Sequence, residues 1–267
     1  MSQQDFENFV VVVTGASTGL GRAIAVETAR RGASDVVINF ARSAEEAEQT
    51  ADLVRAEGAR AFLVQGDVSR DGDCMAIASA ASGLGRIDAL FNNAGVTKFA
   101  QNHADLDAVS AEDFLNLYAV NVVGAFQMIR AARSLLEAAP QPGAVVNTSS
   151  IAGVAGIGSS VPYAASKGAM NTLTLSLARA LAPKIRVNAI CPGFIDTPWF
   201  GKGMSEERVA RLREGSAAST PLKVASTADD VAAAAAFLAS RQSRHVTGET
   251  LLVDAGSHLG FAPLSMR

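Results

Sequence analysis

Short, unbroken apolar runs alternate along this 267-residue chain with longer segments whose apolar residues recur at helical spacing. An unbroken apolar run is typical of a strand buried on both faces, whereas helical spacing indicates a helix with one face in the core. Strands that alternate with helices form parallel sheets. The pattern therefore predicts an α/β fold, a doubly wound parallel sheet with helices on both faces. Strands are expected at residues 9–13, 35–40, 61–65, 87–91, 144–147, 186–190 and 249–253.

A glycine-rich loop follows the first of these strands directly. It reads Thr14-Gly15-Ala-Ser-Thr-Gly19-Leu-Gly21 and leads into a helical segment over residues 22–31. Glycines let the backbone approach a pyrophosphate, and a helix N-terminus offers unpaired amides to it. A tight connection without a ligand is the alternative. Because strand, loop and helix occur in this order, the pattern favours nucleotide binding in a Rossmann-type fold.

The end of the second strand carries a cation where NAD-binding folds of this class usually carry an acid. Residues 41–43 read Ala-Arg-Ser, with no Asp or Glu at the strand end. An acid would hold the ribose 2′-hydroxyl of NAD, whereas a guanidinium suits the 2′-phosphate of NADP. Arg42 therefore predicts NADP(H), with NAD(H) as second choice. Alternatively, Arg42 is a solvated surface residue. Ser43 and Glu46 also have the spacing of a capping box for a helix over 44–57.

Tyr163 and Lys167 are four residues apart, so on a helix both side chains project from one face. Pro162 suits the start of that helix, which is expected over about 163–182. A Tyr hydroxyl has a pKa near 10, and a cation nearby favours the phenolate. With the Ser150 hydroxyl opposite, the pair would form a general acid/base for an alcohol or carbonyl oxygen. An amphipathic helix with an incidental Tyr and a solvated Lys is the alternative.

Polar residues also follow the third and fourth strands, and one interrupts a long helix. Asp67 either caps the next helix or meets an adenine amino group. Asn92-Asn93-Ala94-Gly95 either braces neighbouring loops or lines a cofactor cleft, because open α/β sheets bind ligands at the carboxyl ends of strands. Asn121 interrupts the apolar side of a helix over about 112–137. It either makes a structural hydrogen bond or positions a water near the active site.

The least regular segment covers residues 194–225. It carries Trp199, Phe200 and Met204 interleaved with Gly201 and Gly203. Apolar anchors with glycine hinges suit a mobile lid over a substrate. An excursion of two short helices is the alternative.

Composition narrows the range of partners. Hydrophobic residues make up 49% of the chain, the formal charge is −3, and there is no dense basic run, which argues against nucleic acid and anionic membranes. The N-terminus lacks the features of a signal peptide, and the apolar runs are too short to span a bilayer. Cys74 and Cys191 lack metal-ligand spacing and are interpreted as core thiols of a reducing compartment. One cytoplasmic domain over residues 1–267, with no metal site, is expected.

Taken together, these motifs resemble the short-chain dehydrogenase/reductase family over essentially the whole chain. The matching residues, in family order and spacing, are Thr14-Gly15-x-x-x-Gly19-x-Gly21, Asp67, Asn92-Asn93-Ala94-Gly95, Asn121, Ser150, Tyr163-x-x-x-Lys167 and Pro192-Gly193. The resemblance implies a catalytic tetrad of Asn121, Ser150, Tyr163 and Lys167. Tyr163 would be the acid/base, and Ser150 would hold the carbonyl. Lys167 would contact the nicotinamide ribose and lower the pKa of Tyr163, and Asn121 would hold a water of the proton relay.

The resemblance also implies a set of cofactor-binding residues along the strand ends. Ile195 and Thr197 match positions that usually bind the carboxamide of the nicotinamide. The full set is Gly15, Ser17, Thr18, Gly19, Leu20, Gly21, Phe40, Ala41, Arg42, Ser43, Asp67, Val68, Asn93, Ala94, Gly95, Tyr163, Lys167, Pro192, Gly193, Ile195 and Thr197.

Within the family, the end of the second strand resembles the NADP-dependent 3-oxoacyl-acyl-carrier-protein reductases. Thr18 departs from this pattern, because many NADP-using members carry a second basic residue there. Family members are usually homotetramers packed through two long helices and the C-terminal strand. A homotetramer, or a homodimer, is therefore expected.

The predicted function is the NADP(H)-dependent interconversion of a carbonyl and a secondary alcohol on a small molecule. An NAD(P)-dependent alcohol, polyol or sugar dehydrogenase of the same family and a catalytically silent nucleotide-binding protein are the alternatives. Residues 154–158 and Trp199-Phe200 offer an apolar lining suited to a hydrophobic ketone. Docking an acidic carrier protein requires basic residues, but residues 135–143 contain none, which leaves Lys184 and Arg186 nearby. Free ketones or short oxoacyl thioesters are expected to be reduced as well as carrier-bound ones.

Overall fold

A seven-stranded parallel sheet forms the centre of the computed structural model, which describes residues 4–197, 199 and 205–260. The strand order is β3-β2-β1-β4-β5-β6-β7, so the winding direction reverses between β1 and β4. All seven predicted strands are present, with ends that differ by one or two residues at most. They are β1 (Val10–Val13), β2 (Asp35–Phe40), β3 (Arg60–Gln65), β4 (Ala89–Asn92), β5 (Gly143–Thr148), β6 (Ile185–Pro192) and β7 (Thr250–Val253).

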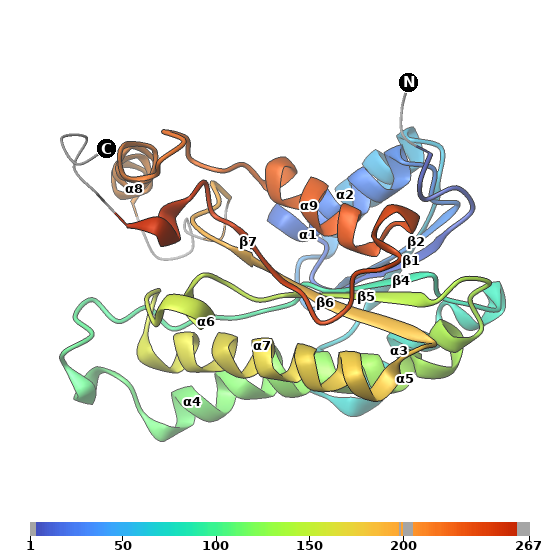
Figure 1. Cartoon of the computed structure of the whole chain (residues 1–267), viewed down its shortest axis with the longest axis horizontal. Helices are drawn as coiled ribbons and strands as arrows, with labels where there is room; N and C mark the ends of the chain where they lie inside the picture. The colour runs from blue at the N-terminus through green and yellow to red at the C-terminus, as the bar shows by residue number, and fades with distance from the viewer. Residues whose placement is uncertain (1–3, 198, 200–204, 261–267) are drawn as a thin grey trace.

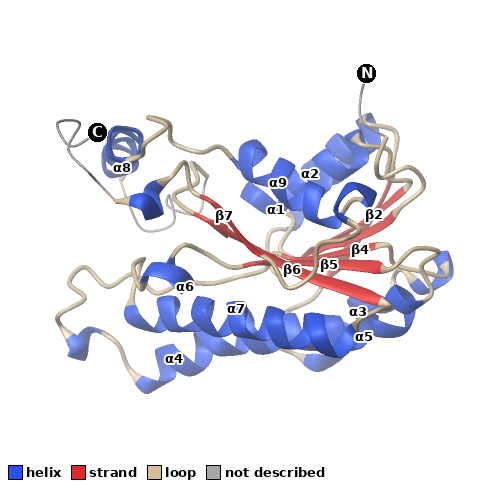
Figure 2. Cartoon of the chain, in the orientation of Figure 1, coloured by secondary structure: helices blue, strands red, loops and turns tan. Residues whose placement is uncertain are grey.

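Helices cover both faces of the sheet, as the doubly wound prediction requires (Figures 1 and 2). The helices α1 (Gly19–Arg30), α2 (Ala44–Ala56) and α9 (Ala228–Ala239) lie on one face. The helices α3 (Asp71–Ser79), α4 (Ala111–Tyr118), α5 (Ala125–Glu137) and α7 (Val161–Leu181) lie on the other. The remaining helices are α6 (Ala152–Ala155), α8 (Glu206–Ser219) and the short 3₁₀ turns Ser82–Leu84, Leu106–Ala108, Arg241–Ser243 and Ser257–Leu259.

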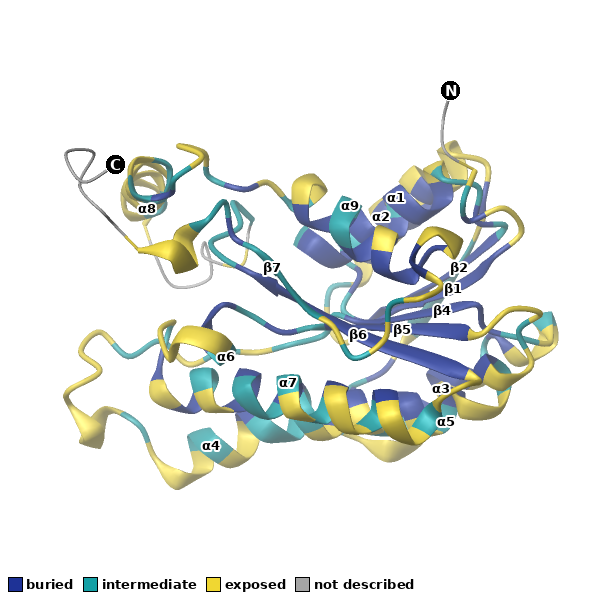
Figure 3. Ribbon diagram, in the orientation of Figure 1, coloured by how far each residue is buried: buried dark blue, intermediate teal, exposed yellow. Residues whose placement is uncertain are grey.

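The unbroken apolar run of β1 is explained by the two cores that it joins. Val11 and Val13 pack into the core beneath α1 and α9, whereas Val10 and Val12 pack with Met128 and other residues of the opposite core. Side chains alternate between the two faces of a strand, so a strand covered on both faces needs apolar residues at every position. Figure 3 shows the sheet as the most deeply buried layer of the molecule.

The helix predicted over 112–137 is interrupted by a π-helical segment, Ala119–Gly124, between α4 and α5. Asn121 lies within this segment and is 1% exposed. Gly124 packs against the segment that follows β3, where a Cβ would lie 2.8 Å from the Val68 Cγ2 atom. Apart from Asn121, the apolar spacing of the sequence continues through residues 119–124, so periodicity alone did not predict the change of helix type. Such π-helical turns occur frequently at functional sites.

The predicted capping box of Ser43 and Glu46 is wrong. Ser43 precedes α2, but its side chain makes no capping hydrogen bond, and its backbone (φ −94°, ψ 71°) is not the extended conformation that favours one. Capping boxes do form at Ser110 before α4 and at Thr227 before α9, where the backbone is extended. The Ser43 hydroxyl is therefore available to a ligand.

The predicted lid segment, residues 194–225, is described only in part. Phe200, Gly201, Gly203 and Met204 lie outside the described residues. The described part contains α8, and Ile195 forms an isolated parallel bridge with Ser226, so the two ends of the segment lie side by side. Across the described residues, every helix is too short or too polar to cross a lipid bilayer.

Candidate active site

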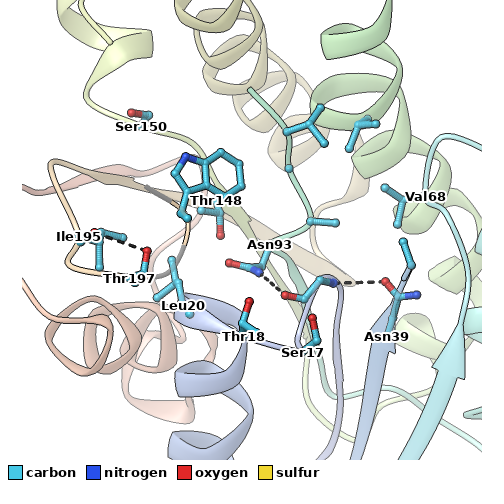
Figure 4. Close-up of a pocket in the computed structure, with 18 of the residues that line it drawn as sticks. Ser17, Thr18, Leu20, Asn39, Val68, Asn93, Thr148, Ser150, Ile195 and Thr197 are labelled. Atoms are coloured by element: carbon cyan, nitrogen blue, oxygen red, sulfur yellow. Dashed lines mark hydrogen bonds between the residues drawn. The ribbon is translucent and has the colours of Figure 1, made fainter. Parts of the chain in front are cut away.

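A cavity of about 480 Å³ opens at the carboxyl ends of the strands. Residues that follow β1 to β6 contribute to its wall (Figure 4). Ser150 and all but two of the predicted cofactor-binding residues line it, the exceptions being Gly21 and Phe40. Asn39, Gly66, Val96, Val120, Thr148 and Ser149 also line it and were not predicted. Ligands of open α/β sheets bind at this edge, where the direction of winding reverses.

The glycine loop after β1 adopts a conformation that other residues would disturb. Gly15 has φ +61° and Gly19 has φ +57°, both in the left-handed region. A Cβ at Gly15 would lie 2.8 Å from the Ala94 Cα atom. At Gly21 a Cβ would lie 2.3 Å from the Gly15 carbonyl oxygen. Gly21 therefore supports the loop by close packing and does not line the cavity.

Two asparagines hold this loop in position. Asn93 Nδ2 donates to the carbonyls of Thr14 and Gly15, each at 3.1 Å. Asn39 Oδ1 accepts from the Gly15 amide at 3.3 Å, and its Nδ2 donates to the Gly66 carbonyl. A polar residue inside the apolar run of β2 was the sequence signal for Asn39, because a buried amide needs partners.

The start of α1 offers the features that a dinucleotide pyrophosphate requires. The Thr18 side chain makes no capping hydrogen bond, so the first amides of α1 remain available to an anion. Ser17, Thr18 and Leu20 lie beside these amides at one border of the cavity (Figure 4). The absence of a Cβ at Gly15 and Gly19 keeps the backbone accessible. The residues present therefore fit a dinucleotide.

The exits of β2 and β3 form the outer end of the cavity. Arg42 is exposed, Ser43 is half-buried, and both line it. Phe40 does not, because its side chain points into the core and is 9% exposed. Burial acts to raise the pKa of the Asp67 carboxyl. Hydrogen bonds from Ser69, with smaller contributions from the charges of Arg70 and Arg42, outweigh it and lower this pKa below its usual value.

Asp67 does not cap α3. Its Oδ1 atom accepts hydrogen bonds from the Ser69 amide at 3.0 Å and from the Ser69 hydroxyl at 2.8 Å, which closes a turn before the helix. The residue at the N-terminal cap of α3 is Arg70. The ionised Asp67 carboxylate therefore stays at the wall of the cavity.

The N-terminal part of α7 brings Tyr163 and Lys167 to the inner end of the cavity. Ser160 caps this helix by accepting from the Tyr163 amide, and Pro162 lies in its first turn, as predicted. Lys167 is 4% exposed, and its Nζ atom donates to the Thr148 carbonyl at 2.7 Å. Nζ also lies 5.7 Å from the centre of the Tyr163 ring.

Burial dominates the ionisation of both side chains. It lowers the pKa of Lys167 to about 8, and Cys191 contributes in the opposite direction. Burial raises the pKa of Tyr163, opposed by hydrogen bonding with Ser150. In this arrangement the pKa of Tyr163 is raised, not lowered by Lys167 as predicted. Burial disfavours the charged phenolate, and Lys167 is not among the groups that shift the pKa of Tyr163.

Ser150 follows β5 by two residues and lines the cavity near Tyr163. Its Oγ atom accepts from the Ala152 amide at 3.1 Å, at the start of α6. The Pro192 carbonyl lies 3.5 Å from Oγ, at the limit of a hydrogen bond. The hydroxyl hydrogen is therefore only weakly engaged and can be offered to a ligand.

Asn121 lies behind the cavity wall and links two of its parts. Its Oδ1 atom accepts from the Val96 amide at 2.8 Å, and Nδ2 donates to the Val96 carbonyl at 3.0 Å. Nδ2 also donates to Ser166 Oγ at 3.1 Å, and Ser166 Oγ donates in turn to the Tyr163 carbonyl. The structural hydrogen bonds considered for Asn121 are therefore present, and they connect the loop after β4 to α7.

Comparison with known proteins agrees with this architecture. Residues 15–258 match the family model described as enoyl-(acyl carrier protein) reductase. The chain is 41% identical to a Streptomyces violaceoruber protein assigned as ketoacyl reductase 2 of the granaticin polyketide synthase, over 94% of this chain and 96% of that one. It is 33% identical to the 3-oxoacyl-acyl-carrier-protein reductase FabG of Staphylococcus aureus strain Mu50, over 93% and 97% of the two chains.

A solved structure extends the agreement to three dimensions. A Burkholderia xenovorans protein assigned to the short-chain dehydrogenases/reductases superposes with a TM-score of 0.86 at 39% identity, over 95% of this chain and 99% of that one. Likeness of this extent covers both the sheet and the segments that line the cavity. The chain therefore belongs to the short-chain dehydrogenase/reductase family, whose enzymes use NAD(P)(H) to act on carbonyl or CH–OH groups of small molecules.

Proposed function

We propose that the protein is an NADP(H)-dependent oxidoreductase that interconverts a carbonyl and a secondary alcohol, with 3-oxoacyl thioesters and related ketones as its substrates. One observation carries this proposal. The hydroxyls of Ser150 and Tyr163 and the ammonium of Lys167 border the same cavity as the glycine loop. An acid/base and a dinucleotide site in one cavity are what a carbonyl reduction needs.

Each residue has a distinct part in this proposal. When bound, the nicotinamide supplies or accepts the hydride. Ser150 Oγ donates a hydrogen bond to the substrate oxygen, since the Ala152 amide occupies only its acceptor side. The Tyr163 hydroxyl gives its proton to that oxygen during reduction. Because burial raises the pKa of Tyr163, the hydroxyl stays protonated at neutral pH, the form that reduction requires.

Lys167 and Asn121 act on the surroundings of Tyr163. Lys167 is positively charged below its pKa of about 8, where it holds the nicotinamide ribose. Asn121 fixes the distance between the loop at Val96 and the helix that carries Tyr163, through the bonds to Val96 and Ser166. The predicted water held by Asn121 stays a prediction.

Arg42→Ala is expected to weaken NADPH binding far more than NADH binding. Arg42 and Ser43 border the outer end of the cavity, Ser43 has no capping bond, and no carboxylate follows β2 directly. A hydrogen bond to a charged group contributes about 1.5–3 kcal/mol, which corresponds to a loss of about ten- to a hundredfold for NADPH. Dissociation constants of both cofactors, measured in both proteins, check this. Equal losses for NADPH and NADH would remove Arg42 from the phosphate site.

The substrate part of the proposal rests on the wall of the cavity and on the surface charges. Val96, Val120, Ile195 and Trp199 give the cavity an apolar side, which suits an acyl chain better than a polyol. Arg186, one of the two cations that the sequence leaves near this region, is only 8% exposed. Its guanidinium donates to the carbonyls of Leu238, Ala239, Ser240 and Val246. Arg186 cannot steer a carrier protein from this position.

We therefore expect one 3-oxoacyl group to be reduced with kcat/KM values within about tenfold of each other as a free ester, on coenzyme A and on a carrier protein. Electrostatic steering can raise association rates by about 10- to 1000-fold, so docking would be visible on this scale. Ribitol and glucose with NADP⁺ complete the panel and test the polyol and sugar alternative. A preference of a hundredfold or more for the carrier form, erased by added salt, would contradict the expectation.

Two further features belong to the proposal. Exposed apolar side chains, among them Leu115, Phe126 and Leu175, lie on α4, α5 and α7. We propose that a homotetramer buries them.

Cys74 and Cys191 are free and buried, which supports a cytoplasmic location where thiols stay reduced.

A further inference from the structure

Thr148 is the last residue of β5, and its hydroxyl has a different environment from the hydroxyls of the next two residues, Ser149 and Ser150. Its Oγ1 atom is closed off from solvent and has no hydrogen-bond partner among the described residues. The Ser149 hydroxyl, by contrast, donates to the Lys167 carbonyl at 3.1 Å, and the Ser150 hydroxyl accepts from the Ala152 amide. Buried hydroxyls in folded proteins almost always have a partner. The unpaired group of Thr148 therefore needs a specific explanation.

The position of Thr148 in the cavity supplies that explanation. Thr148 lines the cavity, and in Figure 4 its side chain lies between Ser150 and Asn93. Its own carbonyl oxygen accepts the 2.7 Å hydrogen bond from Lys167 Nζ. A ligand group that reaches the Lys167 ammonium therefore also comes close to Thr148. A hydroxyl can both donate and accept, so it can pair with a ribose hydroxyl or with an amide.

Two arguments favour the cofactor over the substrate as the partner. Thr148 ends the strand itself, whereas Ser150 lies two residues beyond it, so Thr148 lies deeper in the cavity. Asn93, which follows the neighbouring strand β4, braces the glycine loop from this same level. In open α/β sheets the nucleotide occupies the level directly beyond the strand ends. The substrate oxygen is left to Ser150 and Tyr163.

We propose that Thr148 is a cofactor-binding residue, whose hydroxyl turns toward the cavity when the dinucleotide binds, pairs with its nicotinamide-riboside part, and stays enclosed and unpaired without it. This inference rests on the proposed function, because it takes Lys167 as the ribose contact. Ligand binding would then relieve the cost of an unsatisfied buried hydroxyl. The same side chain would make the cofactor-free protein less stable and the complex tighter.

Thr148→Val removes the hydroxyl and keeps the shape of the side chain. We expect the variant to bind NADPH about three- to tenfold more weakly, the usual range for one neutral hydrogen bond. Without cofactor, its melting temperature should rise by about 2–4 °C, because an unsatisfied polar group is gone. Thr148→Ser restores the hydroxyl and should restore NADPH affinity. Trp199, the one tryptophan of the chain, lines the same cavity and reports binding by its fluorescence.

Thr174→Val is the matched control. Thr174 is fully buried on α7, and its hydroxyl donates to the Met170 carbonyl and accepts from Asn147 Nδ2, both at 2.9 Å. Its removal should lower the melting temperature and leave NADPH affinity unchanged. The opposite signs expected for the two Thr→Val changes separate an unpaired hydroxyl from a paired one.

The outcomes separate this inference from the proposed function. If wild-type protein binds NADPH and Thr148→Val binds it equally well, the inference fails and the proposed function stands. A raised KM for substrate with unchanged NADPH affinity would assign Thr148 to the substrate and also overturn the inference. A lower melting temperature for Thr148→Val would show that the hydroxyl is already paired without cofactor. If wild-type protein binds neither dinucleotide, both fail.

Discussion

Tyr163→Phe is expected to lower kcat for carbonyl reduction by about 10²–10⁴-fold or more, since this range is typical of the loss of a general acid or base. The substitution removes the hydroxyl that would give its proton to the substrate oxygen and leaves the ring in place. Dissociation constants for NADPH should stay near those of the wild type, because only the proton donor is lost. The measurement is kcat and NADPH affinity in the same preparation.

Tyr118→Phe is the matched control for this variant. Tyr118 is the other tyrosine of the chain, ends α4 and does not line the cavity. It should retain near-normal turnover. Near-normal turnover in Tyr163→Phe as well would end the proposed mechanism.

Lys167→Met is expected to weaken dinucleotide binding about tenfold or more, since a hydrogen bond to a charged group is lost. Residual alcohol oxidation should lose the pH dependence near 8 that the ionisation of Lys167 confers, because a methionine at this position carries no charge at any pH. Both effects are measured as NADPH affinity and as the pH profile of oxidation. Lys184→Met, at an exposed position outside the cavity, should change neither.

The same substitution makes a prediction about stability. Burial lowers the pKa of Lys167 to about 8, below the value of about 10.5 that it regains on unfolding. The unfolded state therefore binds more protons between these values, and wild-type stability gains from this group as pH rises from about 8 to 10.5. The gain is on the order of 3 kcal/mol. Lys167→Met should lack it, so the difference in unfolding free energy between wild type and variant should change across this window. A constant difference would contradict the burial of a titrating lysine.

The features that the sequence predicted well depend on spacing and order along the chain. The seven strands followed from unbroken apolar runs, and the position of Tyr163 and Lys167 in one cavity followed from a four-residue spacing on a helix. The features it missed depend on local backbone angles. The φ and ψ of Ser43 prevent the capping bond that its spacing with Glu46 suggested. The π-helical segment at Asn121 leaves the apolar pattern on either side of that residue unchanged, so the pattern did not predict it.

Burial by distant segments explains the remaining differences. The elements packed around Tyr163 raise its pKa by burying the hydroxyl. The spacing between Tyr163 and Lys167 in the sequence gives no information about this burial. The sequence also could not show that the Thr148 hydroxyl has no hydrogen-bond partner among the described residues. The hydroxyls of Ser149 and Ser150, in the same motif, both have hydrogen-bond partners. The position of a residue in a motif therefore predicted which side chains lie together at the site. The packing around each side chain determines its pKa and its hydrogen-bond partners.

The most direct test of hydride transfer with Tyr163 as the acid is a single turnover with NADPH deuterated at the transferred position of the nicotinamide. Enzyme loaded with this cofactor is mixed with the best ketone or oxoacyl thioester of the panel, and the alcohol is analysed by mass spectrometry. The account predicts one deuterium on the carbinol carbon for each NADPH oxidised in the wild type, and a rate at least about a hundredfold lower in Tyr163→Phe. Bound NADPH that transfers no deuterium to any carbonyl, or an equal rate in the variant, would contradict it.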